Sequence, residues 1–233
     1  MTNILSFRYF IPVVLVFIAS CIPPVQGPPP DPRSFDEPDT DLLDLGGTLP
    51  YFEDFMYALD KTHLTHLMVE NGPYTVFAPV QSSFSIFRAE NMIKHLDEYP
   101  SDKLADILRY HFIEGEWTLA DFPEGYLPTL ALENTTGNPI SLFIEKYDFF
   151  RINGRYLLDE PDLGTINGYI HSIGIVLEIP DLMDHLAINR DFSLIRKILN
   201  RRDIDPIFVM RLSNDDPVTF FAPANAAINS IIE

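Results

Sequence analysis

Cysteine is almost absent from this sequence: the single residue, Cys21, excludes an intramolecular disulfide, so the folded part has to be stabilised by packing. Basic residues are also scarce, with 16 Lys and Arg against 34 Asp and Glu and a formal net charge of −18. Such a charge repels phosphate backbones and excludes nucleic acid as the expected partner. The hydrophobic fraction of 46% is enough for one well-packed domain with extra segments at its ends.

Familiar catalytic patterns are missing as well. The sequence contains no G-x-S-x-G elbow, no phosphate-binding glycine loop and no G-x-G-x-x-G pattern. His63 and His66 could share a metal ion, but no third ligand stands nearby at a familiar spacing, which favours an exposed or half-buried helix face. We therefore expect no catalytic residue, no metal and no other cofactor. An enzyme that uses these histidines or a carboxylate pair is the least favoured alternative.

No apolar run at the amino-terminal end is long enough to span a bilayer. The run from Tyr9 to Ala19 has the length of the hydrophobic region of a signal peptide. It leads into "IASC", which resembles a bacterial lipobox and ends on the only cysteine. Residues 1–21 are therefore predicted to be a signal peptide with lipidation at Cys21. Residues 22–41, rich in proline and acidic side chains, are predicted to be an extended tether.

The expected location follows from this anchor. We expect an exported lipoprotein of a bacterial cell envelope, attached by its lipid to the outer membrane or the cell surface. The alternative is an ordinary secretory signal cleaved after Gly27, which would remove Cys21 and give a secreted protein.

Hydrophobic periodicity predicts helices first and strands second, the order of an α+β domain over residues 42–180. Apolar side chains recur at helical spacing over residues 50–70 and again from Phe84 to Leu96, with Met92 on the apolar face. Between these helices, "YTVFAP" has the composition of a short strand that Pro79 ends.

The later part of the domain changes its period. Ser101 is the expected N-cap of a further helix, after which the apolar spacing becomes two from about residue 141. The pairs Asn153-Gly154 and Asn167-Gly168 predict tight turns, because both residues tolerate positive φ. "FFRI-NG-RYLL" is the clearest hairpin in the sequence.

One string occurs twice. "TVFAP" begins at Thr75, and "TFFAP" begins 144 residues later at Thr219, after a second helical pattern that starts near residue 181. The separation is about one domain length, so the repetition predicts a duplicated structural unit.

Three ordered motifs resemble the signatures of the fasciclin-type (FAS1) domain. "TVFAPVQSSF" is similar to the first signature, "RYHFIEGEWTLADF" to the central Tyr-His segment and "INGYIHSIGIVLEIP" to the second signature. The resemblance implies a FAS1 fold over residues 42–180, with a helical N-terminal part packed on a β-sheet wedge. It also implies that residues 181–233 are the start of a second, incomplete FAS1 unit.

The resemblance further implies structural roles for the signature residues, with the two histidines hydrogen-bonded in the packed interior. These residues are Thr75, Phe77, Ala78, Pro79, Tyr110, His111, Asn167, Gly168 and His171.

The family is one of adhesion and interaction modules, which implies a non-enzymatic protein that binds another surface protein or polysaccharide. Together with the predicted lipid anchor at Cys21, we expect this module to be attached to the envelope. The matching position of the family's integrin contact is held here by Glu160, Pro161, Asp162 and Leu163. A turn that caps the sheet and exposes acidic side chains for solubility remains the simpler interpretation of this segment. A secreted module that binds a small molecule or glycan is the alternative function.

Overall fold

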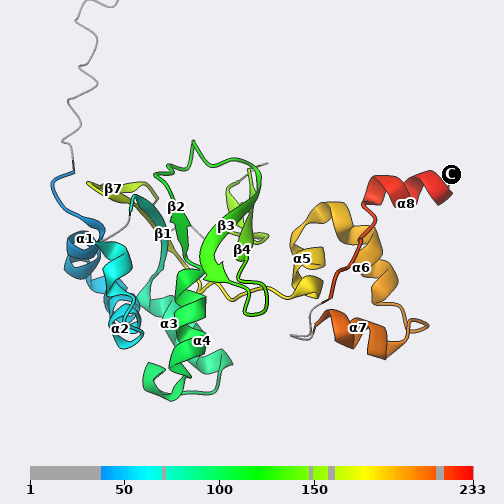
Figure 1. The fold of residues 1–233 in the computed structure, drawn as a ribbon, viewed down its shortest axis with the longest axis horizontal. Helices are drawn as coiled ribbons and strands as arrows, with labels where there is room; N and C mark the ends of the chain where they lie inside the picture. Colours follow the sequence, from blue (N-terminus) through cyan, green and yellow to red (C-terminus); the bar gives the residue numbers. More distant parts are fainter. Residues whose placement is uncertain (1–37, 70–71, 147–148, 157–160, 214–217, 233) are drawn as a thin grey trace, which may run out of the picture. The chain divides into compact units, whose positions relative to one another are not determined.

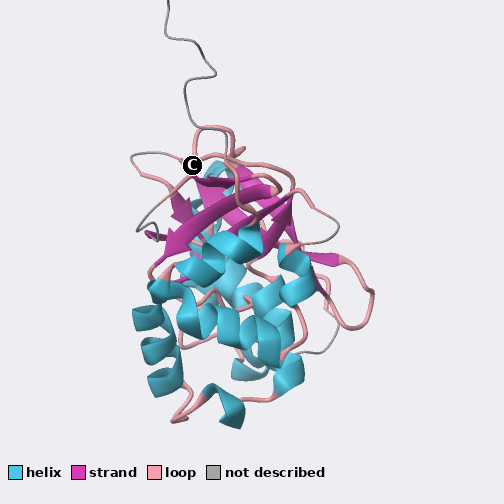
Figure 2. Ribbon diagram, turned by 90° about the vertical axis from the view of Figure 1, so that its left-hand side faces the viewer, coloured by secondary structure: helices cyan, strands magenta, loops and turns pink. Residues whose placement is uncertain are grey.

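The structure is a computed structural model that describes residues 38–69, 72–146, 149–156, 161–213 and 218–232. Cys21 and Glu160 therefore lie outside the described residues. Most of the helices before residue 110 lie on one side of the strands, as Figures 1 and 2 show. The α+β class predicted from the sequence is confirmed.

Helices make up most of the described residues between 38 and 110. Asp41 is the N-cap of the first helix, and its Oδ1 accepts a hydrogen bond from the Asp44 N–H at 2.8 Å. The helical elements of this part are α1 (Leu42–Thr48), η1 (Pro50–Phe52), α2 (Glu53–Lys61), η2 (Thr65–Met68), α3 (Gln81–Glu90), η3 (Leu96–Glu98) and α4 (Ser101–Arg109).

The strands form two four-stranded sheets. The first has the order β2-β1-β8-β7 and contains β1 (Tyr74–Pro79), β2 (Phe112–Glu114), β7 (Leu163–Thr165) and β8 (Gly168–Ile173). The second has the order β3-β4-β5-β6 and contains β3 (Gly125–Leu132), β4 (Pro139–Glu145), β5 (Arg151–Ile152) and β6 (Arg155–Tyr156).

Strand β1 is the centre of the fold. It pairs antiparallel with β2 and parallel with β8, so both of its edges are hydrogen-bonded and all six of its residues are buried. Val76 and Ala78 point into a core formed with the helices, whereas Phe77 points into a second core shared with β4, β5 and β8. A strand covered on both faces is mostly apolar, which explains the composition of "YTVFAP", and the hydroxyl of its buried Thr75 is hydrogen-bonded.

The last part of the described chain is helical and has a small core of its own. It contains α5 (Leu182–Ile188), η4 (Arg190–Phe192), α6 (Ser193–Leu199), α7 (Pro206–Leu212) and α8 (Asn225–Ile232). Leu186, Leu199 and Leu212 are its buried centre. The prediction that residues 181–233 begin a second FAS1 unit stays a prediction.

Two local predictions were wrong. Met92 is 91% exposed, because α3 ends at Glu90, where the Asn91 side chain caps the Phe87 carbonyl, and Met92 turns the chain away with a φ of 55°. Ser101 is the first residue of α4 and not its N-cap, a position that Pro100 occupies. Both Asn-Gly pairs lie at tight turns, as predicted: Asn153-Gly154 joins β5 to β6, and Asn167 lies in the turn between β7 and β8. Asn153 and Gly154 both have positive φ, whereas in the second pair only Gly168 does.

Candidate interaction site

The loop of residues 115–122 is held against the first sheet by two signature side chains. The Thr75 hydroxyl donates to the Gly115 carbonyl at 2.8 Å and accepts from the Trp117 N–H at 2.9 Å. The His171 Nε2 donates to the Trp117 carbonyl at 2.8 Å. Both polar groups of the Trp117 backbone are thus bonded to neighbouring strands, which fixes the loop at this residue.

Asp162 joins this loop to the residues just before β7. Its Oδ1 accepts from the Leu119 N–H at 2.7 Å, while its own N–H donates to His171 Nδ1 at 3.1 Å. Asp162 adopts a φ of 59°, a left-handed conformation that Asp tolerates better than most residues. Its side chain is still 41% exposed, so a partner can reach the carboxylate.

The two hydrogen bonds of His171 determine its proton position. A carbonyl oxygen only accepts, so Nε2 has to carry the hydrogen; a backbone N–H only donates, so Nδ1 has to be bare. Burial lowers the pKa of His171, against smaller opposing effects of the Trp117 carbonyl and the Asp162 carboxylate, whose Oδ1 lies 3.8 Å from Nδ1. The neutral ring is therefore a fixed connector between the two loops.

Behind this connector lies a stack of aromatic rings. Trp117 stacks on Phe122 with ring centroids 5.9 Å apart, and Phe122 stacks on Phe77 at 5.6 Å. Offset stacking of this kind stabilises the packing beyond the buried area alone. We define the contact edge as five exposed and half-buried residues, from the loop and from the segment that Asp162 joins to it: Trp117, Leu119, Pro161, Asp162 and Leu163.

Tyr110 and His111 lie away from the contact edge. The buried Tyr110 hydroxyl donates to the Ser141 carbonyl at 3.1 Å and accepts from Asn153 Nδ2 at 3.0 Å, so it ties β4 to the β5–β6 turn. His111 Nδ1 donates to the Ile107 carbonyl at 2.8 Å, and its Nε2 accepts from the Leu177 N–H at 2.9 Å. Both residues connect parts of the interior and face no open surface.

Asn167 and Gly168 fix the start of β8. The Asn167 side chain accepts from the Leu42 N–H and donates to the Met68 carbonyl, each at 2.9 Å, and so attaches α1 and η2 to the sheet. Gly168 has a φ of +149°, and a Cβ there would lie 1.8 Å from the Tyr74 carbonyl oxygen. Only glycine fits at this point of the sheet.

A family model described as the fasciclin domain matches residues 50–180, more than half of the chain. The chain belongs to the fasciclin family. The resemblance seen in the three motifs is thereby confirmed, and the fasciclin domain is the part that carries both sheets and the contact edge.

Known proteins from distant organisms share this domain. Protein sll1483 of Synechocystis sp. is 30% identical over 129 residues, which cover 55% of this chain and 68% of that protein. Stabilin-2 of Rattus norvegicus is 26% identical over 196 residues, which cover 78% of this chain but only 13% of that protein. Among solved structures, the chain is similar to a FAS1 domain pair from the insect cell adhesion molecule Fasciclin I, with a TM-score of 0.46 and 19% identity. The match covers 81% of this chain and 64% of that chain.

Within the fasciclin domain, the predicted site residues separate into two groups. Thr75 and His171, expected to be structural, meet the predicted contact residue Asp162 at one loop, and Pro161 and Leu163 flank it. The remaining signature residues lie in the interior. Trp117 and Leu119 were not predicted from the sequence as parts of the contact edge. The sequence feature that could have pointed to Trp117 is that it is the only tryptophan of the chain.

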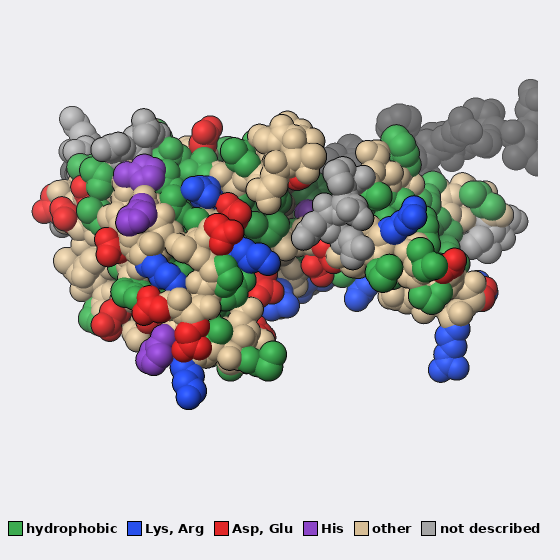
Figure 3. Space-filling view, turned by 60° about the horizontal axis from the view of Figure 1, so that its bottom comes forward, with side chains coloured by type: hydrophobic (Ala, Val, Ile, Leu, Met, Phe, Trp, Pro, Cys, Tyr) green, Lys and Arg blue, Asp and Glu red, His purple; other side chains and the backbone are tan. Residues whose placement is uncertain are grey.

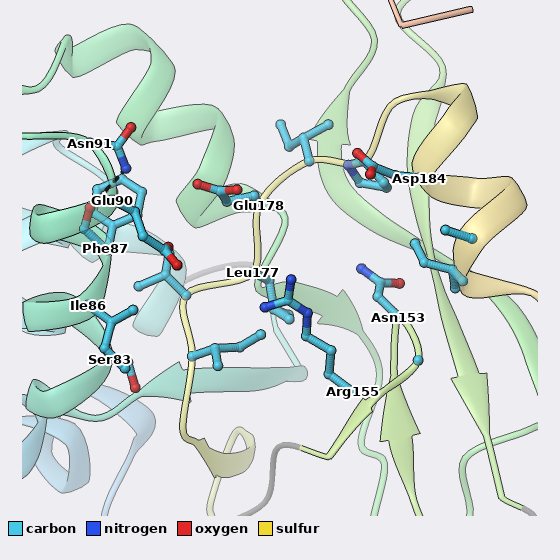
Figure 4. A pocket seen from close by; sticks show the side chains of 17 residues that line it. Ser83, Ile86, Phe87, Glu90, Asn91, Asn153, Arg155, Leu177, Glu178 and Asp184 are labelled. Atoms are coloured by element: carbon cyan, nitrogen blue, oxygen red, sulfur yellow. Dashed lines mark hydrogen bonds between the residues drawn. The ribbon is translucent and has the colours of Figure 1, made fainter. Parts of the chain in front are cut away.

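A groove of about 630 Å³ lies elsewhere on the fasciclin domain and the helix that follows it. Glu90 at the end of α3 and Arg155 of the β5–β6 hairpin extend into it, with Glu178 and Asp184 on the neighbouring segments (Figure 4). Its lining mixes both charges with apolar side chains such as Ile86, which is 51% exposed. Such a groove can hold a polar small molecule.

His63 lies between α2 and η2, and His66 lies in η2. His63 and His66 are both exposed, and His66 Nδ1 lies 2.9 Å from the His63 carbonyl. Among the described residues, no group of three or more His, Cys, Asp or Glu side chains is placed to hold an ion.

Acidic and basic side chains lie among one another on the face of the molecule shown in Figure 3. None of the helices described is long and apolar enough to cross a membrane.

Proposed function

We propose that this fasciclin-family protein is a non-enzymatic adhesion module that binds another surface protein or polysaccharide through the contact edge. The observation that carries the proposal is Asp162. Its backbone and one carboxylate oxygen are fixed by His171 and Leu119, while 41% of its side chain stays exposed. A charged group held in one orientation loses little conformational entropy on binding.

The contact edge combines features that suit a protein or glycan surface. Trp117 and Leu119 offer apolar area, Asp162 offers a charge, and Pro161 limits the freedom of the backbone. One such edge gives a modest affinity, so we expect adhesion to depend on many copies displayed side by side. A lipid on Cys21 and a tether over residues 22–41 would provide that display.

Adhesion can be measured with beads that carry the purified chain on cells of the producing organism. We expect beads with wild-type protein to bind and beads with Asp162→Asn to bind less, although this substitution keeps an oxygen that can accept from the Leu119 N–H. Asp102→Asn, which changes an exposed acidic residue on α4, outside the contact edge, is the matched control and should bind as wild type. Equal binding by the Asp162 and Asp102 variants would refute the role of the contact edge.

Two further arms define the partner and the anchor. Protease treatment of the cells abolishes binding if the partner is a protein, and periodate treatment abolishes it if the partner is a polysaccharide. Incorporation of labelled palmitate should disappear in Cys21→Ser, and labelling that survives this substitution would refute the lipid anchor.

The groove supports a second candidate, a secreted module that binds a small molecule or glycan. Arg155 could pair with an acidic group of such a ligand, with Glu90 facing it across the groove. Binding of soluble glycans that is lost in Arg155→Ala and kept in Asp162→Asn would favour this function over adhesion.

A further inference from the structure

Residues 181–232 repeat the element order of the first helical part. Asp181 caps α5 as Asp41 caps α1, and in each case the Asp accepts from the N–H three residues later, at 2.7 and 2.8 Å. A 3-10 helix and a second α-helix follow in both copies, η4 and α6 in one, η1 and α2 in the other. The elements α5, η4 and α6 each begin 140 residues after α1, η1 and α2, respectively.

The repeat continues through the second copy of the string. Helix α8 begins at Asn225, 144 residues after the start of α3 at Gln81, the same separation that relates Thr219 to Thr75. Buried positions correspond as well. Leu199 matches Leu59 at the separation of 140 residues, and Ile228 matches Phe84 at the separation of 144 residues. The later segment therefore repeats α1, η1, α2 and α3 of the first unit.

The two copies differ at the strand. Residues 218–223 form no strand, whereas their counterparts form β1 with paired edges. The alternation is kept, since Phe220 and Ala222 pack against the core of α5, α6 and α7. Phe221 points away from that core and is 91% exposed, whereas its counterpart Phe77 is fully buried.

We propose that residues 218–223 are an acceptor for a β-strand of the β8 type, which pairs with them in parallel. In the first unit, β8 covers β1 in this way, from Tyr74 opposite Gly168 to Pro79 opposite Ile173. The corresponding partner strand has glycine opposite Val218, an apolar side chain like that of Ile170 opposite Phe220, and a ring like that of His171 opposite Phe221. Addition of a strand to an open edge is a common mode of peptide recognition.

The probe is a synthetic peptide of residues 166–179, "INGYIHSIGIVLEI", labelled and carrying added lysines for solubility. We expect saturable binding to the full chain, measured by fluorescence anisotropy. Phe221→Asp should weaken this binding by about tenfold or more, because it removes the ring that would pack beside His171 of the peptide and puts a charge there. The same peptide with Gly168→Val should also bind about tenfold more weakly or worse.

The control is Ile231→Asp, which changes an equally accessible apolar side chain, 85% exposed, on α8. Both protein variants alter exposed residues, so both should fold, and circular dichroism would establish this. Binding lost equally in both variants, or kept in Phe221→Asp, would overturn the proposal. A second copy of the wild-type chain is the alternative occupant of this segment. Self-association that is abolished by Phe221→Asp and is not displaced by the peptide would show this and would also overturn the proposal.

Discussion

The stability of the fasciclin domain should depend on pH through His111. The ring is completely buried after α4, with Nδ1 bonded to the Ile107 carbonyl and Nε2 accepting from the Leu177 N–H. Burial lowers the pKa of His111 from 6.5 to about 4, with the Ile107 hydrogen bond acting weakly in the opposite direction. The folded state therefore keeps this ring neutral at pH values where the unfolded chain binds a proton.

The sign and size of the effect follow from proton linkage. Above pH 6.5 both states hold a neutral ring, so the free energy of unfolding does not depend on this group. Between pH 6.5 and about 4 only the unfolded state is protonated, and stability falls as the pH falls. The difference in pKa corresponds to a loss of roughly 3 kcal/mol, complete near the lower value. Burial lowers the pKa values of His171 and His185 too, and they add to the loss.

Urea unfolding at a series of pH values measures this slope directly. His111→Gln removes the titrating ring, so we expect it to be less stable at neutral pH by about 1–3 kcal/mol but to lose less stability on acidification. His66→Gln, which changes an exposed histidine, should keep the wild-type slope. An identical slope in His111→Gln and wild type would show that the buried ring is not the source of the pH dependence.

Two further predictions concern the interior. Gly168→Ala should destabilise the domain by about 3 kcal/mol or more, because the added Cβ would meet the Tyr74 carbonyl oxygen. The control Gly137→Ala, at a residue with a φ of +68° and open space around it, should cost about 1 kcal/mol. Similar midpoints of thermal unfolding for the two variants would contradict the close contact at Gly168. Tyr110→Phe should cost about 1–2 kcal/mol in urea unfolding, because it removes the hydroxyl between Ser141 and Asn153. A loss no larger than that of Tyr57→Phe, which changes an exposed tyrosine that bonds to Asp97, would argue against this role of Tyr110.

Local patterns in the sequence were enough to predict several elements. The strand at "YTVFAP" and the hairpin at Asn153-Gly154 were predicted correctly, because each depends on the residues within it. The errors at Met92 and Ser101 are of one or a few residues at helix ends. There the side-chain cap of Asn91 and the backbone of Pro100 decide the boundary, and periodicity does not report on either.

The contact edge could be predicted only in part. Asp162 was found through the family resemblance, but its bond to Leu119 joins residues 43 positions apart and leaves no local trace. The same is true of Thr75 and Trp117, which are 42 positions apart. Such pairs are set by the way the loop crosses the sheet, and this crossing depends on the whole fold.

Hydrogen exchange of the adhering protein tests the central claim most directly. The full chain would be bound to envelope preparations of the producing organism, and amide protection would be compared with that of the free chain. The account predicts added protection at residues 115–122 and 161–163, where the contact edge lies. Protection confined to the groove, at residues 153–155 and 175–180, or no change at the contact edge, would contradict it.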